Sequence, residues 1–100
     1  MALEITGNIE LDNGLSLSSC YGRTQYRVND NSNEVVIITQ YWVDEPSYTT
    51  GKSPLNVNIN VDGRYTYNRA TDGVDVLDFT NQKIKSELEN LGFSVSITEL

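Results

Sequence analysis

The stretch PLNVNINVDGRYTYNR, residues 54–69, decides the fold, because the turn within it determines which side of the sheet its last residues occupy. Its aliphatic residues alternate with asparagine and aspartate, which is the period-2 pattern of a half-buried strand; these positions are Leu55, Val57, Ile59 and Val61. Two tyrosines follow the Asp-Gly pair, also at period 2. The turn between the two halves determines whether the rings join the aliphatic side or the asparagine side.

Two turns are compatible with this stretch. A two-residue turn at Asp62-Gly63 places Tyr65 and Tyr67 beside the asparagines and exposes both rings. A three-residue loop, beginning one residue earlier, puts both rings on the aliphatic side, where cross-strand pairs of an aromatic and a β-branched residue contribute about 0.2–1 kcal/mol each. We therefore predict the three-residue loop and a scaffold role for the tyrosines. The expected pairs are Ile59 with Tyr65 and Val57 with Tyr67.

The same register test applies to the start of the chain. Apolar residues share odd parity there, with Gly7 interrupting at a position that suits a bulge or a close backbone approach. A three-residue loop over Asp12-Asn13-Gly14, with Gly14 in the left-handed conformation, sets the apolar residues of the two strands on one face. The predicted pairs are Leu11 with Leu15 and Ile9 with Leu17.

The middle of the chain predicts a second pair of strands. A dense turn signal at residues 29–33 separates a polar strand, residues 21–28, from an apolar strand, residues 34–43. Val35 to Ile38 is apolar on both faces, which favours a central strand covered by a helix on one side and by sheet or a partner on the other. Residues 44–54 contain two prolines and a glycine and are expected to form a loop.

The end of the chain predicts one helix and a final strand. An apolar stripe at helical spacing and a glycine stop at Gly92 place the helix at about residues 76–91; the stripe is Leu77, Ile84, Leu88 and Leu91. Asp75, Asp78 and Thr80 are alternative N-caps. Residues 93–98 alternate as a last strand. We predict one α+β domain, residues 1–100, with a mainly antiparallel sheet of about five or six strands and the helix packed on a face.

The composition excludes several kinds of chemistry. Histidine is absent and Cys20 is the single cysteine, which removes histidine-based nucleophile pairs, histidine metal motifs and intrachain disulfides. A net charge of −7 with scattered basic residues argues against a nucleic-acid partner. No apolar run reaches the roughly 20 residues of a membrane-spanning helix, and the start lacks the pattern of an export signal. We expect no enzyme activity, no cofactor, and no membrane partner.

Two groups of residues are candidates for a site. Asp72, Asp75 and Asp78 follow one another at intervals of three, but they lack the glycine and terminal glutamate of a calcium loop, so no metal is predicted. The aromatic residues Tyr41, Trp42 and Tyr48 are the predicted partner-binding surface, since aromatic side chains dominate interface energies. The alternative for Trp42 is a place in the core.

Three segments carry a resemblance in length and texture to a class of proteins. They are MALEITGNIELDNG at the start, YWVDEPSYTTGKSPL in the middle and IKSELENLGFSVSITEL at the end. The whole chain resembles the short structural proteins encoded by tailed bacteriophages. The resemblance implies a virion subunit of the head, neck or tail, assembled in the host cytoplasm, that contacts other virion proteins as an oligomer or within a larger assembly. The alternative is a stand-alone ligand-binding or carbohydrate-binding module that uses Trp42, Tyr48 and the asparagine face.

Overall fold

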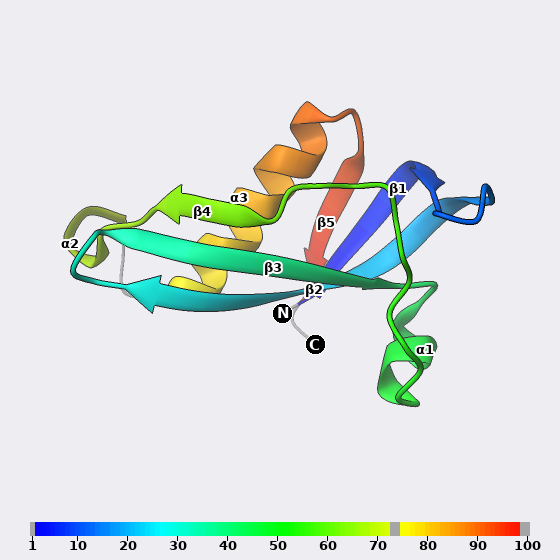
Figure 1. Cartoon of the computed structure of the whole chain (residues 1–100), viewed down its shortest axis with the longest axis horizontal. Helices are drawn as coiled ribbons and strands as arrows, with labels where there is room; N and C mark the ends of the chain where they lie inside the picture. Colours follow the sequence, from blue (N-terminus) through cyan, green and yellow to red (C-terminus); the bar gives the residue numbers. More distant parts are fainter. Residues whose placement is uncertain (1, 73–74, 99–100) are drawn as a thin grey trace.

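The computed structural model describes residues 2–72 and 75–98, which form one antiparallel sheet and three helices (Figure 1). The strands lie in the order β4-β3-β2-β1-β5, so β2 is central. This architecture confirms the predicted α+β class with a helix on one face and a C-terminal strand. The elements are β1 (Ala2–Glu10), β2 (Ser16–Asn29), β3 (Glu34–Trp42), α1 (Glu45–Thr49), β4 (Gly63–Thr66), α2 (Arg69–Asp72), α3 (Val76–Asn90) and β5 (Ser94–Thr98).

The β1–β2 hairpin has the predicted register. Ile9 lies opposite Leu17, the Leu11 amide donates to the Leu15 carbonyl at 2.8 Å, and Gly14 has φ +85°, as the three-residue loop requires. The register shifts between Thr6 and Ile9, which confirms the bulge expected at Gly7. A Cβ on Gly7 would lie 2.7 Å from the Phe93 ring, so the close approach is present as well.

The β2–β3 hairpin turns at the predicted place, and its strands extend from Ser16 to Asn29 and from Glu34 to Trp42. The first strand is longer than predicted, because the segment that returns from the β1–β2 turn runs directly into residues 21–28 as one β2. β3 is the second strand from an edge, since β2 pairs on one side and β4 on the other.

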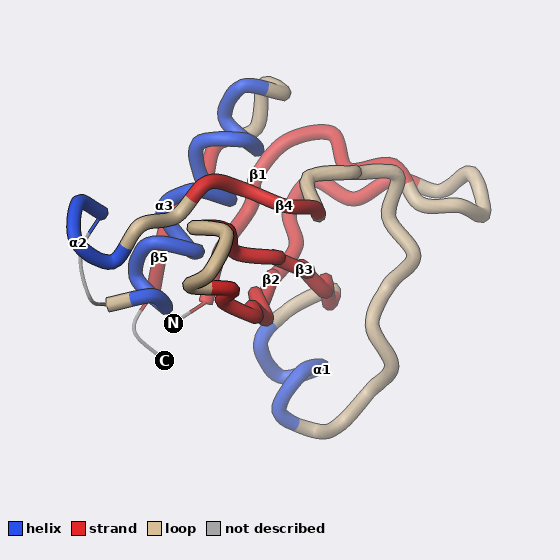
Figure 2. The backbone as a smooth tube through the Cα atoms, turned by 60° about the vertical axis from the view of Figure 1, so that its left-hand side comes forward, coloured by secondary structure: helices blue, strands red, loops and turns tan. Residues whose placement is uncertain are grey.

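The predicted hairpin, with its loop at Val61-Asp62-Gly63 and its pairs Ile59 with Tyr65 and Val57 with Tyr67, is wrong. Tyr65 pairs with Val35 of β3, while the preceding extended segment reaches Tyr41 and Leu11 through single bridges made by Leu55 and Val57. β3 is already paired with β2 on one side and has a free edge on the other. β4 therefore pairs with that edge instead of folding back on residues 55–61. We call residues 55–62 the arch, because Figure 2 shows the chain between α1 and β4 as a wide excursion from the sheet.

The side of the two tyrosines is nevertheless the one predicted. Tyr67 is 1% exposed and joins the same core cluster as Val61, and half-buried Tyr65 packs against that cluster. The Tyr67 and Phe79 rings lie 4.6 Å apart between centroids. Alternation of apolar and polar residues thus determined which face was dry, although the pairing partner was different.

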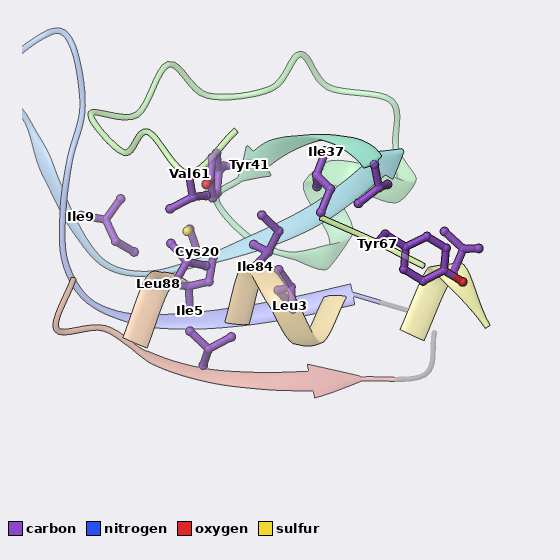
Figure 3. Close-up of a cluster of buried hydrophobic side chains, with 13 residues drawn as sticks. Leu3, Ile5, Ile9, Cys20, Ile37, Tyr41, Val61, Tyr67, Ile84 and Leu88 are labelled. Carbon is purple, nitrogen blue, oxygen red and sulfur yellow. The ribbon is translucent and has the colours of Figure 1, made fainter. Parts of the chain in front are cut away.

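α3 covers the inner face of the sheet, as the core close-up shows (Figure 3). α3 packs on β5, β2 and β1, and its Ile84 and Leu88 are fully buried in the core cluster. Leu91, counted in the predicted stripe, is 58% exposed because it follows the last helical residue. Among the three possible caps the structure uses Asp75, whose carboxylate accepts from the Asp78 amide at 3.1 Å. Gly92 has φ +98°, as predicted for the helix end.

Two short helices were not predicted. α1 forms in the segment expected to be a loop, because Asp44 caps the Ser47 amide at 2.9 Å and Pro46 lies in the first turn, where a proline is tolerated. α2 follows β4 and is held to the β2–β3 turn by Arg69, whose Nε lies 2.8 Å from the Asp30 carboxylate. α1 lies on the face of the sheet opposite to α3, because its Tyr48 packs against Trp42 on that face.

Candidate protein-interaction face

The outer face of β2, β3 and β4 is left open where α1 ends. Directly paired residues of antiparallel strands point to the same face, so the register places Val36 between Arg27 of β2 and Arg64 of β4. Ile38 lies opposite Gln25. We call this surface the open face; its residues are Arg23, Gln25, Arg27, Val36, Ile38, Gln40 and Arg64.

The aliphatic part of the open face is accessible to solvent. Ile38 is 49% exposed and Val36 is half-buried, whereas their neighbours Val35 and Ile37 are fully buried on the inner face. The doubly apolar strand that the sequence predicted therefore has one covered side and one uncovered side. A shallow hollow over these residues extends along β2 and β3 and is lined by Gln25, Tyr26, Arg27, Val36 and Ile38.

The charge on the open face is opposite to that of the whole chain. Three of the four arginines lie on it, although the chain carries −7. Arg64 reaches the Glu34 carboxylate at 3.7 Å with its side chain 77% exposed, and Arg27 is exposed. Exposed ion pairs of this kind contribute little to stability, so the guanidinium groups remain accessible to a partner.

An aromatic cluster closes one end of the open face. It consists of Tyr21 of β2, Trp42 of β3 and Tyr48 of α1, with 4.8 Å between the Trp42 and Tyr48 ring centroids and 5.6 Å between those of Tyr21 and Tyr48. The Arg23 guanidinium lies 4.4 Å from the Tyr48 centroid, a cation–π geometry. The Trp42 indole donates to the Lys52 carbonyl at 2.8 Å, which ties the chain after α1 to the cluster.

The structure separates the three aromatic residues predicted as a partner surface. Trp42 and Tyr48 pack together on the outer side, while Tyr41 points into the inner core. Trp42 is 7% exposed and Tyr41 is 4% exposed, so half-buried Tyr48 is the most accessible of the three rings. The partner-binding role of these residues remains a prediction.

The carbohydrate alternative required Trp42, Tyr48 and the asparagines together. The asparagines lie on the arch, whereas Trp42 and Tyr48 lie together beside α1, and Trp42 presents little of its ring to solvent. A sugar can stack only on an aromatic ring whose face is accessible to solvent, and the Trp42 ring is not. The asparagine side chains, Asn56, Asn58 and Asn60, are exposed.

The aspartates after β4 have local structural partners. Asp72 accepts from the Asn68 amide at 2.9 Å, and Asp75 caps α3. Within residues 2–72 and 75–98, no group of three or more histidine, cysteine, aspartate or glutamate side chains is placed to hold a metal ion. Cys20 is buried, and this burial raises the pKa of its thiol to about 12, so the thiol stays protonated and unreactive at neutral pH.

The sequence contains a signal for the open face. Arg23, Gln25 and Arg27 alternate with less polar residues along β2, and the turn at residues 29–33 fixes their register with β3. The alternation along β2 and the register with β3 together place Arg27 directly beside Val36. The contribution of Arg64 could not be deduced, because the pairing of β4 with β3 was not foreseen.

The chain matches no protein-family model, no curated protein and no solved structure. None of the helices in the part of the chain that the structure describes is both long enough and apolar enough to cross a membrane.

Proposed function

We propose that this protein is a non-enzymatic structural subunit of a phage virion, in the head, neck or tail, that acts through contacts with other virion proteins and with copies of itself. The observation that carries the proposal is the open face. An exposed aliphatic pair, Val36 and Ile38, flanked by arginines combines the residue types that protein interfaces use. The virion setting rests on the resemblance of the chain to small phage structural proteins.

The open face suits a flat partner surface. Its rows of side chains project from three adjacent strands, with arginines outside and aliphatic groups inside, which matches the arrangement of an apolar centre and a polar rim. Tyr48 extends this surface at one end, and its contact with Arg23 holds the ring against β2. The interface that we propose therefore runs from Val36 to Tyr48 along the outer side of β3.

The experiment compares two substitutions of the same kind. Ile38→Glu introduces a charge in the centre of the open face, and Leu15→Glu introduces it at another exposed leucine, 64% accessible, in the β1–β2 turn. Both variants should fold, because Ile38 and Leu15 are both exposed, at 49% and 64%. Size-exclusion chromatography with light scattering, on the protein alone and co-expressed with virion proteins of tailed bacteriophages, should show assembly for the wild type and Leu15→Glu and its loss for Ile38→Glu.

Mass spectrometry of gradient-purified particles tests the virion setting itself. We expect peptides of this chain at a fixed ratio to the major virion proteins. A chain that is absent from particles, and monomeric with every co-expressed virion protein, would rule the proposal out.

A further inference from the structure

Unpaired charges of opposite sign lie at the two ends of the outer side of the sheet. At one end, Arg27 is exposed and has no ion-pair partner among the described residues. At the other end, Glu4 faces outward because it pairs directly with Tyr21, and it lines a shallow hollow together with Asp44 and Glu45. Neither glutamate has an ion-pair partner in the part of the chain that the structure describes. The outer side therefore has a positive end and a negative end.

The remaining charges on the outer side are paired locally. On the described outer rows of β2, β3 and β4 the one carboxylate is Glu34, and Arg64 holds it at 3.7 Å. At the negative end, Lys52 lies near enough to Asp44 to help lower the pKa of that carboxyl, after the hydrogen bonds from Ser47. Arg27 and the two glutamates therefore carry the charge that the fold leaves uncompensated.

The two charged ends are arranged so that a second copy can bring them together. Arg27 lies beside Val36 and Tyr21 lies beside Trp42, so the ends are six residues apart along β2, or roughly 20 Å. A two-fold axis that runs across the strands at the level of Thr39 lies midway between them. Rotation about this axis turns the outer side of a second copy toward the first and reverses its strands. The positive end of each copy then lies on the negative end of the other.

The same rotation brings a cover to the uncovered part of the open face. α1 occupies the Trp42 end of the outer side and, with five residues, is about 7.5 Å long. The rotation places α1 of the second copy over Val36 and Ile38. The exposed apolar residues at that helix are Pro46 and the neighbouring Val43. The two helices lie at opposite ends of the shared layer, so each fills the space that the other leaves.

We propose that the open face binds a second copy of this chain in a two-fold dimer. In this dimer α1 of each copy covers Val36 and Ile38 of the other, and Arg27 of each copy meets Glu4 and Glu45 of the other. A two-fold interface must be self-complementary, and opposite charges on either side of an apolar centre meet that requirement. The inference rests on the proposed role of the open face as a protein interface, and it names the partner that this face takes.

The test exchanges the charges between two variants. Arg27→Glu sets acid against acid in a homodimer, and the double variant Glu4→Arg, Glu45→Arg sets base against base. Each variant alone should dimerise roughly tenfold more weakly than the wild type, or weaker still, in size-exclusion chromatography with light scattering. An equimolar mixture restores both contacts with their signs exchanged, so it should regain the dimer. The controls are Lys85→Glu and Glu89→Lys, the same reversals on α3 at the opposite face, and they should leave the dimer unchanged.

The outcomes separate this inference from the proposed function. A monomeric wild type, an assembly larger than two copies, or a mixture that does not regain the dimer would each overturn the inference. A monomeric wild type that still binds a co-expressed virion protein, and loses it with Ile38→Glu, would leave the function standing without the dimer. A dimer that mixing restores, in a chain that is absent from particles, would leave the dimer standing without the virion setting.

Discussion

Replacement of Tyr67 by alanine should remove a large part of the stability of the protein. The ring is 1% exposed and packs on Phe79 at 4.6 Å between centroids. A buried aromatic side chain covers about 150–250 Å², and truncation of such a ring costs about 3–5 kcal/mol once the cavity is included. A domain of this size is stable by only about 5–15 kcal/mol, so we expect a fall in Tm of roughly 15–30 °C.

Tyr65→Ala is the matched control. Tyr65 is the same residue type, two positions earlier and half-buried, and its hydroxyl donates to the Val61 carbonyl. Its loss should cost about 1–2 kcal/mol, from partial burial and one hydrogen bond. Urea unfolding followed by Trp42 fluorescence gives both values, and Tyr67→Leu replaces Tyr67→Ala if the latter does not fold. An equal or larger cost for Tyr65→Ala would show that the two rings are assigned to the wrong depths.

Three further predictions concern single positions. Gly7→Ala should destabilise by about 1–3 kcal/mol in the same urea assay, because its Cβ would lie 2.7 Å from the Phe93 ring at φ +151°; an unchanged midpoint would contradict this contact. The Cys20 thiol, with its pKa raised by burial, should react with Ellman's reagent only after unfolding, and rapid labelling of the native protein would refute its burial. Hydrogen bonds from Ser47 lower the pKa of the Asp44 carboxyl. The capping of α1 by Asp44 should therefore be present above pH 4 and be lost as acid protonates the carboxylate. NMR signals of α1 that stay constant below pH 4 would exclude this capping role.

The sequence allowed prediction of features that depend on neighbours along the chain. The β1–β2 loop, the bulge at Gly7 and the C-terminal end of α3 each follow from a glycine conformation next to a regular apolar pattern. These signals are local, because the turn residue and the paired residues lie within a few positions of one another. The strand from 94 to 98 was also recognisable, but its partner, β1, lies at the other end of the chain.

The pairing of β4 could not be predicted for the same reason. The segments on either side of the predicted loop at residues 61–63 are adjacent and alternate in phase, so a hairpin satisfied every local rule. The competing partner, Val35 to Ile37 of β3, was already half of a ladder with β2 and lay far away in sequence. Only the complete sheet shows that β4 is stabilised more by pairing with β3 than by folding back on residues 55–61. α1 differs, since Asp44 followed by Pro46 is a helix-start signal that the loop interpretation overlooked.

The extent of the open face follows from how far a short helix can reach. α1 has five residues and is about 7.5 Å long, whereas Trp42 and Val36 are six residues apart on an extended strand, or roughly 20 Å. α1 can therefore cover Trp42 but not Ile38 or Val36. On the other side, β4 pairs with β3 for four residues only, which leaves the edge at Thr39 to the arch. β3 is thus incompletely covered on its outer face, and this is the place where we expect other molecules to bind.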